Sequence, residues 1–344
     1  MKDFFAADAA QHENKTVISF FLVAQKQLRT KRENGEYLSL QLSDKTGQMD
    51  ARMWENFETL VKEFEAGDVV KVQATVCRFA DKLQLRIEKI RKAAANEFEL
   101  ADLVPHTEHD INDLWSKLNG FVSSFTDTHL HALVRSFLDD EAFAAKLKSA
   151  PAAKGIHHAY IGGLLEHIVS VLGLCEMAAS HYPHIHRDLL MTGAIFHDIG
   201  KLQELEWGSS FEYTLEGQLL GHINIGMRWI DARIAALPDF PDSLRLLVQH
   251  IVLSHHGRLE FGSPKLPMIP EAILLNYLDE LDAKMQTVQN ELRRATGMGR
   301  GPDEMTEWVR SLERPLLNTR LFLATRHEPE ALERNENDGV SPQD

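Results

Sequence analysis

A Phe-His-Asp-Ile-Gly-Lys segment in the middle of the chain, residues 196–201, places three polar side chains where they can face one space. His197 and Asp198 follow an apolar stretch that predicts a helix, and Lys201 lies one helical turn further on. An imidazole beside a carboxylate is a ligand pair typical of hydrolytic divalent-metal sites, in which open positions remain for water. The segment predicts part of a metal centre, although a lone His-Asp pair is also common at solvated helix ends.

Further metal-ligand residue types occur in segments whose apolar spacing is otherwise that of core helices. Each one alone is more often a satisfied core or surface residue. Burying all of them unpaired would be costly unless a shared partner satisfied them, and a divalent metal centre is such a partner. The 17 histidines of the chain are in excess of a chance content and concentrate in its middle third. The residues concerned are His167, His222, His255, His256, Asp279 and Asp282.

These residues require a helical domain to position them. Helical periodicity extends from residue 111 to about residue 325, and it predicts an all-α domain over that range. Residues 94–110 lose periodicity and turn acidic, which indicates a linker. Residues 326–344 are polar, acidic and contain Pro and Gly, so we expect a disordered acidic tail.

The first 93 residues read as β structure instead. Alternating apolar residues occur in 16–30, in 36–54 around the turn Asp-Lys-Thr-Gly, and in 67–93 around a turn at residues 80–82, with a short helical stretch at 55–65. Five strands in about 90 residues are the layout of a small Greek-key barrel. The pattern L-x-L-x-D-x-T-G, then A-R-x-W and G-D-x-V-x-V, resembles the OB-fold of nucleic-acid-binding proteins. We therefore expect a multidomain protein with an OB-fold barrel followed by an all-α domain.

Composition limits the classes of function. With 344 residues and 44% hydrophobic residues, the chain is long and apolar enough for about two folded domains. It has neither a run of roughly 20 apolar residues nor a signal-peptide pattern, so we expect a cytoplasmic protein without a membrane segment. Cys77 and Cys175 are isolated, which excludes a disulfide scaffold or a zinc ribbon.

Charge separates the two parts of the chain. The net charge of −14 argues against indiscriminate coating of nucleic acid. Residues 1–93, however, hold 16 Lys and Arg against 14 Asp and Glu, whereas the remainder holds 21 against 37. We expect the two parts to face different partners.

The order H…HD(x2)K…H…HH…D over residues 150–290 resembles the HD-domain metal-dependent phosphohydrolases. The resemblance implies a minimal metal site, with Asp279 preferred to Asp282 as its last ligand, and a fuller set in binuclear members, where Asp198 bridges two ions. It also implies that Lys201 contacts the substrate phosphate and that Asp198, Lys201 and His222 are the catalytic residues. The implied metal ligands are His167, His197, Asp198, His222, His255, His256 and Asp279.

Residues 149–171, SAPAAKGIHHAYIGGLLEHIVSV, resemble the entry to the HD domain of the YhaM-type 3′→5′ exoribonucleases, which join an OB-fold to an HD domain in this order. This resemblance implies hydrolysis of single-stranded RNA, or also DNA, from the 3′ end with release of nucleoside monophosphates. One or two ions are expected: His and carboxylate ligands suit Mn or Fe best, and Mg, Co and Ni remain open. A homo-oligomer is also compatible. The expected substrate contacts are His157, His158 and Tyr160 near the metal site, and Tyr37, Arg52, Trp54, Arg78, Phe79 and Lys82 on the barrel.

Three alternatives remain open. A phosphohydrolase of nucleotides or cyclic dinucleotides would share the metal site without needing the barrel, although the GYP motif of the cyclic-diguanylate group is replaced by Arg-Leu-Glu-Phe-Gly after His-His-Gly. A non-catalytic nucleic-acid-binding regulator would have a degenerate HD fold, which the intact ligand set disfavours. Oxygenase chemistry at a di-iron site would use the same ligand types.

Overall fold

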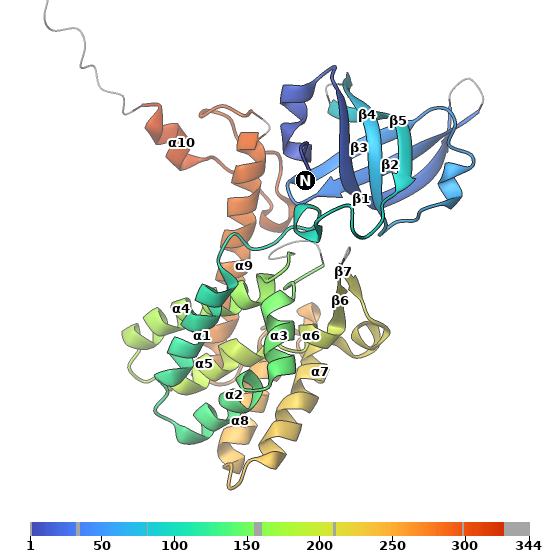
Figure 1. Ribbon diagram of the computed structural model, residues 1–344. Coiled ribbons are helices and arrows are strands. Elements are labelled where there is room, and N and C mark those ends of the chain that lie inside the picture. Colours follow the sequence, from blue (N-terminus) through green and yellow to red (C-terminus); the bar gives the residue numbers. More distant parts are fainter. Residues whose placement is uncertain are drawn as a thin grey trace, which may run out of the picture. The chain divides into compact units, whose positions relative to one another are not determined.

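The computed structural model describes residues 2–31, 35–80, 82–154, 160–208, 211–297 and 299–326. The chain divides into two compact units, Met1–Asp282 and Ala283–Asp344. The first unit contains a β-barrel, drawn in blue to cyan in Figure 1, and most of the helices, drawn from cyan-green to orange. The fold class expected from the sequence, a small barrel followed by a helical region, is confirmed.

The N-terminal barrel is closed by five strands in the order β1-β2-β3-β5-β4. All pairs are antiparallel except β3 with β5, which is parallel. The turn Asp-Lys-Thr-Gly connects β2 to β3 as the sequence predicts, whereas Asp81 of the turn predicted at residues 80–82 lies outside the described residues. The strands are β1 Thr16–Thr30, β2 Glu36–Asp44, β3 Gly47–Met53, β4 Val69–Phe79 and β5 Lys82–Lys92, preceded by the 3-10 helix η1 Ala6–His12.

Alternation along the strands sorts the barrel residues into two faces. Side chains of successive strand residues point to opposite sides, so Leu38, Leu40 and Leu42 of β2 are buried in the barrel core. The residues between them face outward. Because β2 and β3 pair Leu40 with Ala51, the outward residues of the two strands also lie beside each other.

Two segments around the barrel differ from the expected helix and linker. Residues 55–65 contain only a single 3-10 turn, η2 Leu60–Lys62, because the segment is anchored by the buried rings of Phe57 and Phe64 rather than by a helical face. Residues 94–110 include the 3-10 turn η3 Leu100–Asp102. Leu103 is buried there and packs with Leu22 and Val69. This segment is therefore partly packed against the barrel.

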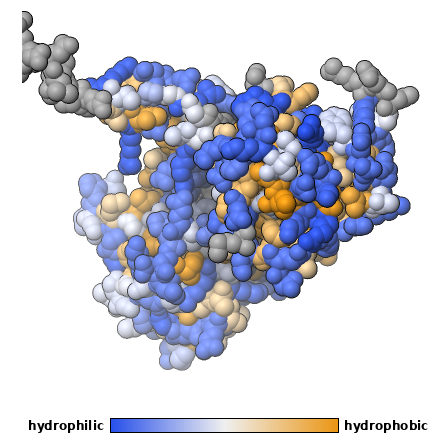
Figure 2. Space-filling view, turned by 45° about the horizontal axis from the view of Figure 1, so that its top comes forward, coloured by the Kyte–Doolittle hydropathy of each residue, from blue (hydrophilic) through white to orange (hydrophobic). Residues whose placement is uncertain are grey.

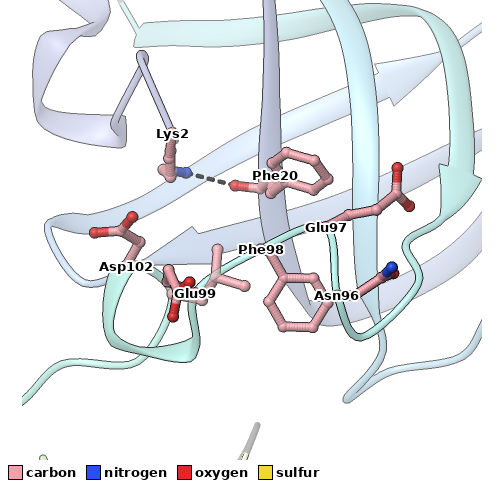
Figure 3. A pocket seen from close by; sticks show the side chains of 8 residues that line it. Lys2, Phe20, Asn96, Glu97, Phe98, Glu99 and Asp102 are labelled. Carbon is pink, nitrogen blue, oxygen red and sulfur yellow. Dashed lines mark hydrogen bonds between the residues drawn. The ribbon is translucent and has the colours of Figure 1, made fainter.

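A small cavity of about 150 Å³ lies between η3 and the start of the chain. Figure 3 shows the Lys2 ammonium donating to the carbonyl of Phe20 at its edge, with Asp102 and the Phe98 ring nearby. Lys2 also pairs with Asp44 at 2.9 Å. Burial lowers the pKa of Lys2, and Asp44 partly offsets that effect. These contacts tie the N-terminal segment to the barrel.

The helical region surrounds one apolar core built from α1–α9. Helix α5 is buried along nearly its whole length because it runs through this core. Side-chain caps at Asp110, Asp127 and Asp140 begin α1, α2 and α3 by accepting backbone N–H groups. The helices are α1 Ile111–Ser123, α2 Thr128–Leu138, α3 Glu141–Ser149, α4 Gly163–His181, α5 Arg187–Phe196, α6 Lys201–Glu204, α7 Leu215–Ala236, α8 Asp242–Ser254, α9 Pro270–Gly297 and α10 Thr319–Ala324.

The region from 111 to 325 is not helical throughout. A hairpin of β6 Leu205–Trp207 and β7 Phe211–Tyr213 interrupts it, where aromatic residues alternate with acidic ones. Residues 299–318 contain the 3-10 turn η5 Arg310–Leu312 and no α-helix, since Gly299, Gly301 and Pro302 break helical periodicity. The 3-10 turn η4 Leu259–Phe261 follows α8. Of the predicted tail 326–344, residues 327–344 lie outside the described residues.

Helix α4 is long and apolar enough by composition to span a membrane, but more than half of its apolar window is buried inside the protein. Such core helices of soluble proteins pass the same test, so the finding is weak evidence for a membrane segment. Figure 2 shows one face of the molecule, which is mainly hydrophilic with apolar groups interspersed. Scattered exposed apolar residues are usual on folded proteins.

The buried carboxylate of Asp188 fastens the start of α2 to α5. It accepts hydrogen bonds from the backbone N–H groups of Thr126 and Asp127, at 2.6 and 2.8 Å, and from the Thr126 hydroxyl, and it pairs with Arg187. Burial by itself would raise the pKa of Asp188, but these hydrogen bonds outweigh burial and lower it.

Replacing Asp188 with Asn is expected to lower the free energy of unfolding by about 1–3 kcal/mol at pH 7, because a charged hydrogen-bond acceptor is lost. A carboxyl group with a depressed folded pKa stabilises the protein above its unfolded pKa and loses that effect as the pH falls through its folded pKa. The difference between Asp188→Asn and wild type should therefore shrink from about pH 4 downward. Urea unfolding at pH 7 and below pH 4 measures it. Asp50→Asn, at an exposed position of β3, serves as the control. Equal stability of Asp188→Asn and wild type at pH 7 would contradict the expectation.

Candidate metal centre and nucleic-acid interface

Seven His and Asp side chains from five parts of the helical fold meet at one place. Helix α4 supplies His167, and the turn that ends α5 supplies His197 and Asp198. Helix α7 supplies His222, and α9 supplies Asp279. The end of α8 supplies the remaining two, His255 and His256. Helices α4, α5, α7, α8 and α9 also contribute apolar residues to the core of the helical region.

The first group of ligand atoms comes from His167, His197 and Asp279, which all lie within 4.8 Å of one another. The Nε2 atom of His167 is 3.2 Å from that of His197 and 3.2 Å from Oδ1 of Asp279. Oδ2 of Asp198 approaches the same group, at 3.4 Å from Nε2 of His197. Two imidazoles and two carboxylate oxygens therefore face one small volume.

The second group consists of His222, His255 and His256, again within 4.8 Å of one another. Oδ1 of Asp198 lies 3.4 Å from Nε2 of His222 and 3.8 Å from Nε2 of His255. The two oxygens of Asp198 are thus directed to different groups. This is the arrangement that a carboxylate bridging two cations requires.

The hydrogen bonds behind the five histidines show which ring nitrogen is free to coordinate. In every case Nδ1 lies 2.8–3.1 Å from an oxygen acceptor, so Nδ1 carries the proton in the neutral ring and Nε2 presents its lone pair to the site. The acceptors are Asp282 for His167, the Ala194 carbonyl for His197, Glu204 for His222, the Val252 carbonyl for His255 and the Phe261 carbonyl for His256.

The arrangement of these nitrogen and oxygen atoms fits a bound cation better than a network of hydrogen bonds among protein groups alone. Among the described residues, Nε2 of His222 and Nε2 of His255 are the buried side-chain polar atoms that lack a hydrogen-bond partner. Both lie near Oδ1 of Asp198, so lone pairs would face lone pairs at short range without a positive charge between them. Buried polar groups of this kind are costly unless they are satisfied. The donor set of imidazoles and carboxylates is one that divalent transition metals accept.

The charges of the site follow from burial and from mutual contacts. Burial lowers the pKa of His255 well below its usual value and also lowers that of His256, which keeps both rings neutral, as coordination requires. For His167 burial acts in the same direction, but Asp279 and Asp282 outweigh it and raise its pKa to about 10. The metal-free protein therefore carries His167 in its doubly protonated form near neutral pH, and a bound ion would have to displace the proton on Nε2.

The Asp198 carboxylate also accepts a hydrogen bond from Lys201 at 2.6 Å. Burial would raise the pKa of Asp198, but Lys201 and the nearby His197 hold it well below its usual range. Burial would lower the pKa of Lys201, and Asp198 raises it instead. Lys201 is thus a charged group at the site that uses one of its three N–H donors on Asp198.

Two glycines allow the elements of the site to approach one another. A Cβ on Gly200 would lie 1.9 Å from the carbonyl oxygen of His222, so only glycine lets the turn after Asp198 pack against α7. Gly221 has a φ of +70° and breaks α7 immediately before His222. The break frees the backbone N–H of His222 from the helix, and Glu204 accepts it at 3.0 Å.

Sequence reasoning missed some supporting residues. Glu204, Ser170 and Asn276 were not predicted, and Asp282 was considered only as a replacement for Asp279. Asn276 donates to the carbonyl of His255 at 2.9 Å and ties the end of α8 to α9. Helical spacing carried a signal for two of them, because Ser170 follows His167 by three residues and Asp282 follows Asp279 by three. Glu204 had no such signal.

The two carboxylates on α9 occupy different places. Asp279 directs Oδ1 to Nε2 of His167, inside the ligand group, whereas Asp282 contacts Nδ1 of the same ring from behind. Replacing Asp279 with Asn is therefore expected to reduce metal-dependent activity by about 10²-fold or more even with excess metal. Asp282→Asn should recover much of its activity as metal is added, because no ligand is lost. Activity titrations with Mn would measure both variants, and the reverse order would contradict the assignment of Asp279.

Three predicted contacts near the metal site have different outcomes. His157 and His158 lie outside the described residues. Tyr160 is half-buried just before α4, and its carbonyl accepts the N–H of Gly163.

On the barrel, outward residues of β2, β3 and β4 and the residue that follows β3 form a platform of aromatic rings and one guanidinium group. We call it the barrel platform, and its residues are Tyr37, Arg52, Trp54 and Phe79. The Tyr37 and Trp54 rings stack with their centroids 4.6 Å apart. The Arg52 guanidinium lies 4.9 Å from the Phe79 ring centroid and 6.0 Å from that of Tyr37. Phe79 is 57% exposed and Trp54 37% exposed, so ring surface remains available to a ligand.

The other two predicted barrel contacts differ from the platform. Lys82 is exposed at the start of β5 and pairs in register with Phe79. Arg78 lies at the end of β4 and shares the strand face of the buried residues Val72, Ala74 and Val76. Its guanidinium pairs with Glu13 at 2.9 Å. Strand alternation therefore separates Arg78 from its neighbour Phe79.

Comparison with known proteins agrees with this division. Residues 164–284 match the family model of the HD domain, and residues 23–93 match that of the OB-fold nucleic acid binding domain. The chain thus contains an OB-fold followed by a helical region with an HD domain. An HD domain indicates a metal-dependent phosphohydrolase.

Solved structures with similarity include the second OB-fold domain of replication protein A from Methanococcus maripaludis, at 20% identity and a TM-score of 0.20. That match covers 25% of this chain and 91% of the other. Aspartyl tRNA synthetase from Entamoeba histolytica matches at 12% identity and a TM-score of 0.23, over 54% of this chain. The second match spans only 38% of the synthetase.

Proposed function

We propose that the protein is a metal-dependent phosphodiesterase that degrades single-stranded RNA from its 3′ end and releases nucleoside monophosphates. The observation that carries the hydrolytic part is the position of Asp198 between two groups of ligand nitrogens whose lone pairs point inward. The barrel platform supports a single-stranded polynucleotide as substrate. The direction of digestion rests on the resemblance to the YhaM-type exoribonucleases.

The residues of the proposed site have separate tasks. When bound, divalent ions supply Lewis-acid polarisation of the phosphoryl group and activate water. His167, His197 and Asp279 would hold one ion, His222, His255 and His256 the other, and Asp198 would touch both. Lys201 keeps two N–H donors beyond the one used on Asp198 and would direct them to a phosphate oxygen. Burial of His167, His197, Asp198 and His255 strengthens the electrostatic effect of the site.

The proposed role of the barrel is to hold the strand. Bases stack on aromatic side chains irrespective of their identity, and cationic groups such as Arg52 follow the phosphates. Phosphate contacts predict that binding weakens as salt increases. A chain with a net charge of −14 needs such a local surface to bind a polyanion at all.

The test is digestion of a 5′-labelled single-stranded oligoribonucleotide by the full-length protein, with and without Mn, resolved by product length. A ladder that shortens from the 3′ end only with metal supports the proposal. A matched single-stranded DNA measures the preference between the two polymers. Inert oligonucleotides together with hydrolysis of nucleotides or cyclic dinucleotides would favour the small-molecule phosphohydrolase, and binding without any hydrolysis would favour a regulator.

Metal content gives an independent check. The gently purified protein is expected to carry one or two transition-metal ions per chain, because all five Nε2 atoms and two carboxylates converge on the site. Elemental analysis measures the content, and Asp198→Asn provides the control. Protein that binds no ion even after incubation with Mn would contradict the metal hypothesis.

A further inference from the structure

The five histidines of the site differ in what holds them from behind. His197, His255 and His256 donate from Nδ1 to backbone carbonyls three to five residues away in their own part of the chain. The other two, His167 and His222, donate instead to carboxylates. The backbone carbonyl acceptors are neutral and lie close in sequence to their histidines. The carboxylate acceptors are negatively charged and belong to other elements of the fold.

The two carboxylates belong to different ligand groups. Asp282 of α9 accepts Nδ1–H of His167 at 2.8 Å, and His167 is in the first group. Glu204 of α6 accepts Nδ1–H of His222 at 3.1 Å, and His222 is in the second group. Each ligand group thus has one histidine supported by a carboxylate.

Each carboxylate is itself fixed by a second donor. The Ser170 hydroxyl, one turn from His167 on α4, donates to Oδ1 of Asp282. The backbone N–H of His222 donates to Oε1 of Glu204, the oxygen that also faces the ring. Both carboxylates are more than nine-tenths buried as residues. They therefore have little freedom to leave their histidines.

A carboxylate behind a ligating histidine orients the ring and makes Nε2 more basic, which strengthens its bond to a cation. We infer that Asp282 and Glu204 are positioning residues, each of which sets the metal affinity of its own ligand group, so that the two groups can be emptied separately. The inference rests on the proposed metal-dependent function. Asp198 is the one ligand that both groups share, and it limits how independent they are.

The experiment compares metal binding by full-length wild type, Glu204→Gln and Asp282→Asn. Both replacements retain an amide oxygen that can accept the histidine Nδ1–H, remove the negative charge and turn the second oxygen into an NH2 donor. Glu206→Gln is the matched control, because Glu206 is an exposed acid two residues from Glu204 and outside the site. Isothermal titration with Mn measures affinity and stoichiometry, and electron paramagnetic resonance distinguishes a coupled pair of ions from isolated ones. Thermal unfolding of the metal-free proteins reports whether the fold is retained.

Wild type and Glu206→Gln are expected to bind two ions per chain and to give the spectrum of a coupled pair. Each of the two positioning variants should keep one ion at nearly wild-type affinity and bind the other about 10–100-fold more weakly. When Mn is limiting, each positioning variant should give the electron paramagnetic resonance spectrum of isolated ions. The double variant should bind both ions weakly.

Alanine variants of the two histidines identify which group each carboxylate serves. Adding Glu204→Gln to His222→Ala should cause little further loss of metal, whereas adding it to His167→Ala should weaken the remaining ion. Ser170→Ala removes only the hydroxyl that donates to Asp282, so it is a milder change than Asp282→Asn. It should weaken binding of the same ion that Asp282→Asn weakens, and of no other.

Two results would overturn the inference while leaving the proposed function intact: both positioning variants bind both ions as wild type does, or each weakens both ions equally. Wild-type protein that binds no Mn at all would overturn the proposed function and the inference with it.

Discussion

Replacing Asp198 with Asn is expected to reduce metal-dependent hydrolysis by about 10³-fold or more, the largest effect of any single substitution in the helical region. Its two oxygens lie 3.4 Å from a histidine nitrogen in each ligand group, so the change removes negative charge from both at once. Side-chain volume is almost unchanged. The measurement is turnover of RNA and of a small chromogenic phosphodiester, combined with metal content.

This substitution also leaves the ammonium of Lys201 without its carboxylate partner. Unfolding of the metal-free variant must therefore be measured beside activity, to separate loss of the site from loss of the fold. Glu206→Gln again serves as the control. Near-normal turnover by a folded Asp198→Asn protein with both ions bound would contradict the bridging role of Asp198.

Removing two rings of the barrel platform, Trp54→Ala together with Phe79→Ala, is expected to weaken binding of single-stranded RNA at least about 30-fold. Stacking of a base on an aromatic side chain is worth about 1–3 kcal/mol, so two lost stacking surfaces correspond to about 2 kcal/mol or more. Fluorescence anisotropy with a labelled oligoribonucleotide measures the affinity at several salt concentrations.

Hydrolysis of a small chromogenic phosphodiester should be unaffected by this double variant, because all candidate metal ligands lie after residue 160. Ile18→Ala is the matched control: Ile18 is an exposed apolar residue of β1 outside the platform, 58% exposed. Degradation of long RNA at the wild-type rate by the double variant would show that the barrel does not hold the substrate. A nucleotide phosphohydrolase would then be the better interpretation.

Several features of this protein were determined by local sequence alone. Alternation of apolar and polar residues in 16–54 and 67–93 predicted the five strands, because successive side chains of a strand point to opposite faces. Helical periodicity likewise predicted the core helices that bear the histidines. The residue types, imidazole and carboxylate, already indicated the class of metal chemistry, since coordination preference belongs to the side chain.

Short segments between these elements were less predictable. Residues 55–65 form only one 3-10 turn because Phe57 and Phe64 are fixed by the barrel core, which is a tertiary constraint. The β6–β7 hairpin and the non-helical residues 299–318 lie within a region that average periodicity assigned to helix. In such pieces packing outweighs the weak local preference.

Only the tertiary structure decided how six of the seven candidate ligand residues divide into two groups, with Asp198 between them, and which residues support them. Asp279 and Asp282 are equivalent by helical spacing, and the contacts with opposite nitrogens of His167 distinguish them. Glu204 reaches His222 only because Gly221 breaks α7 and Gly200 permits the close approach. Arg78 and Phe79 are neighbours in sequence but point apart, and Arg52 joins Phe79 across strands. These contacts join residues that are far apart in the chain, and local sequence patterns do not predict such contacts.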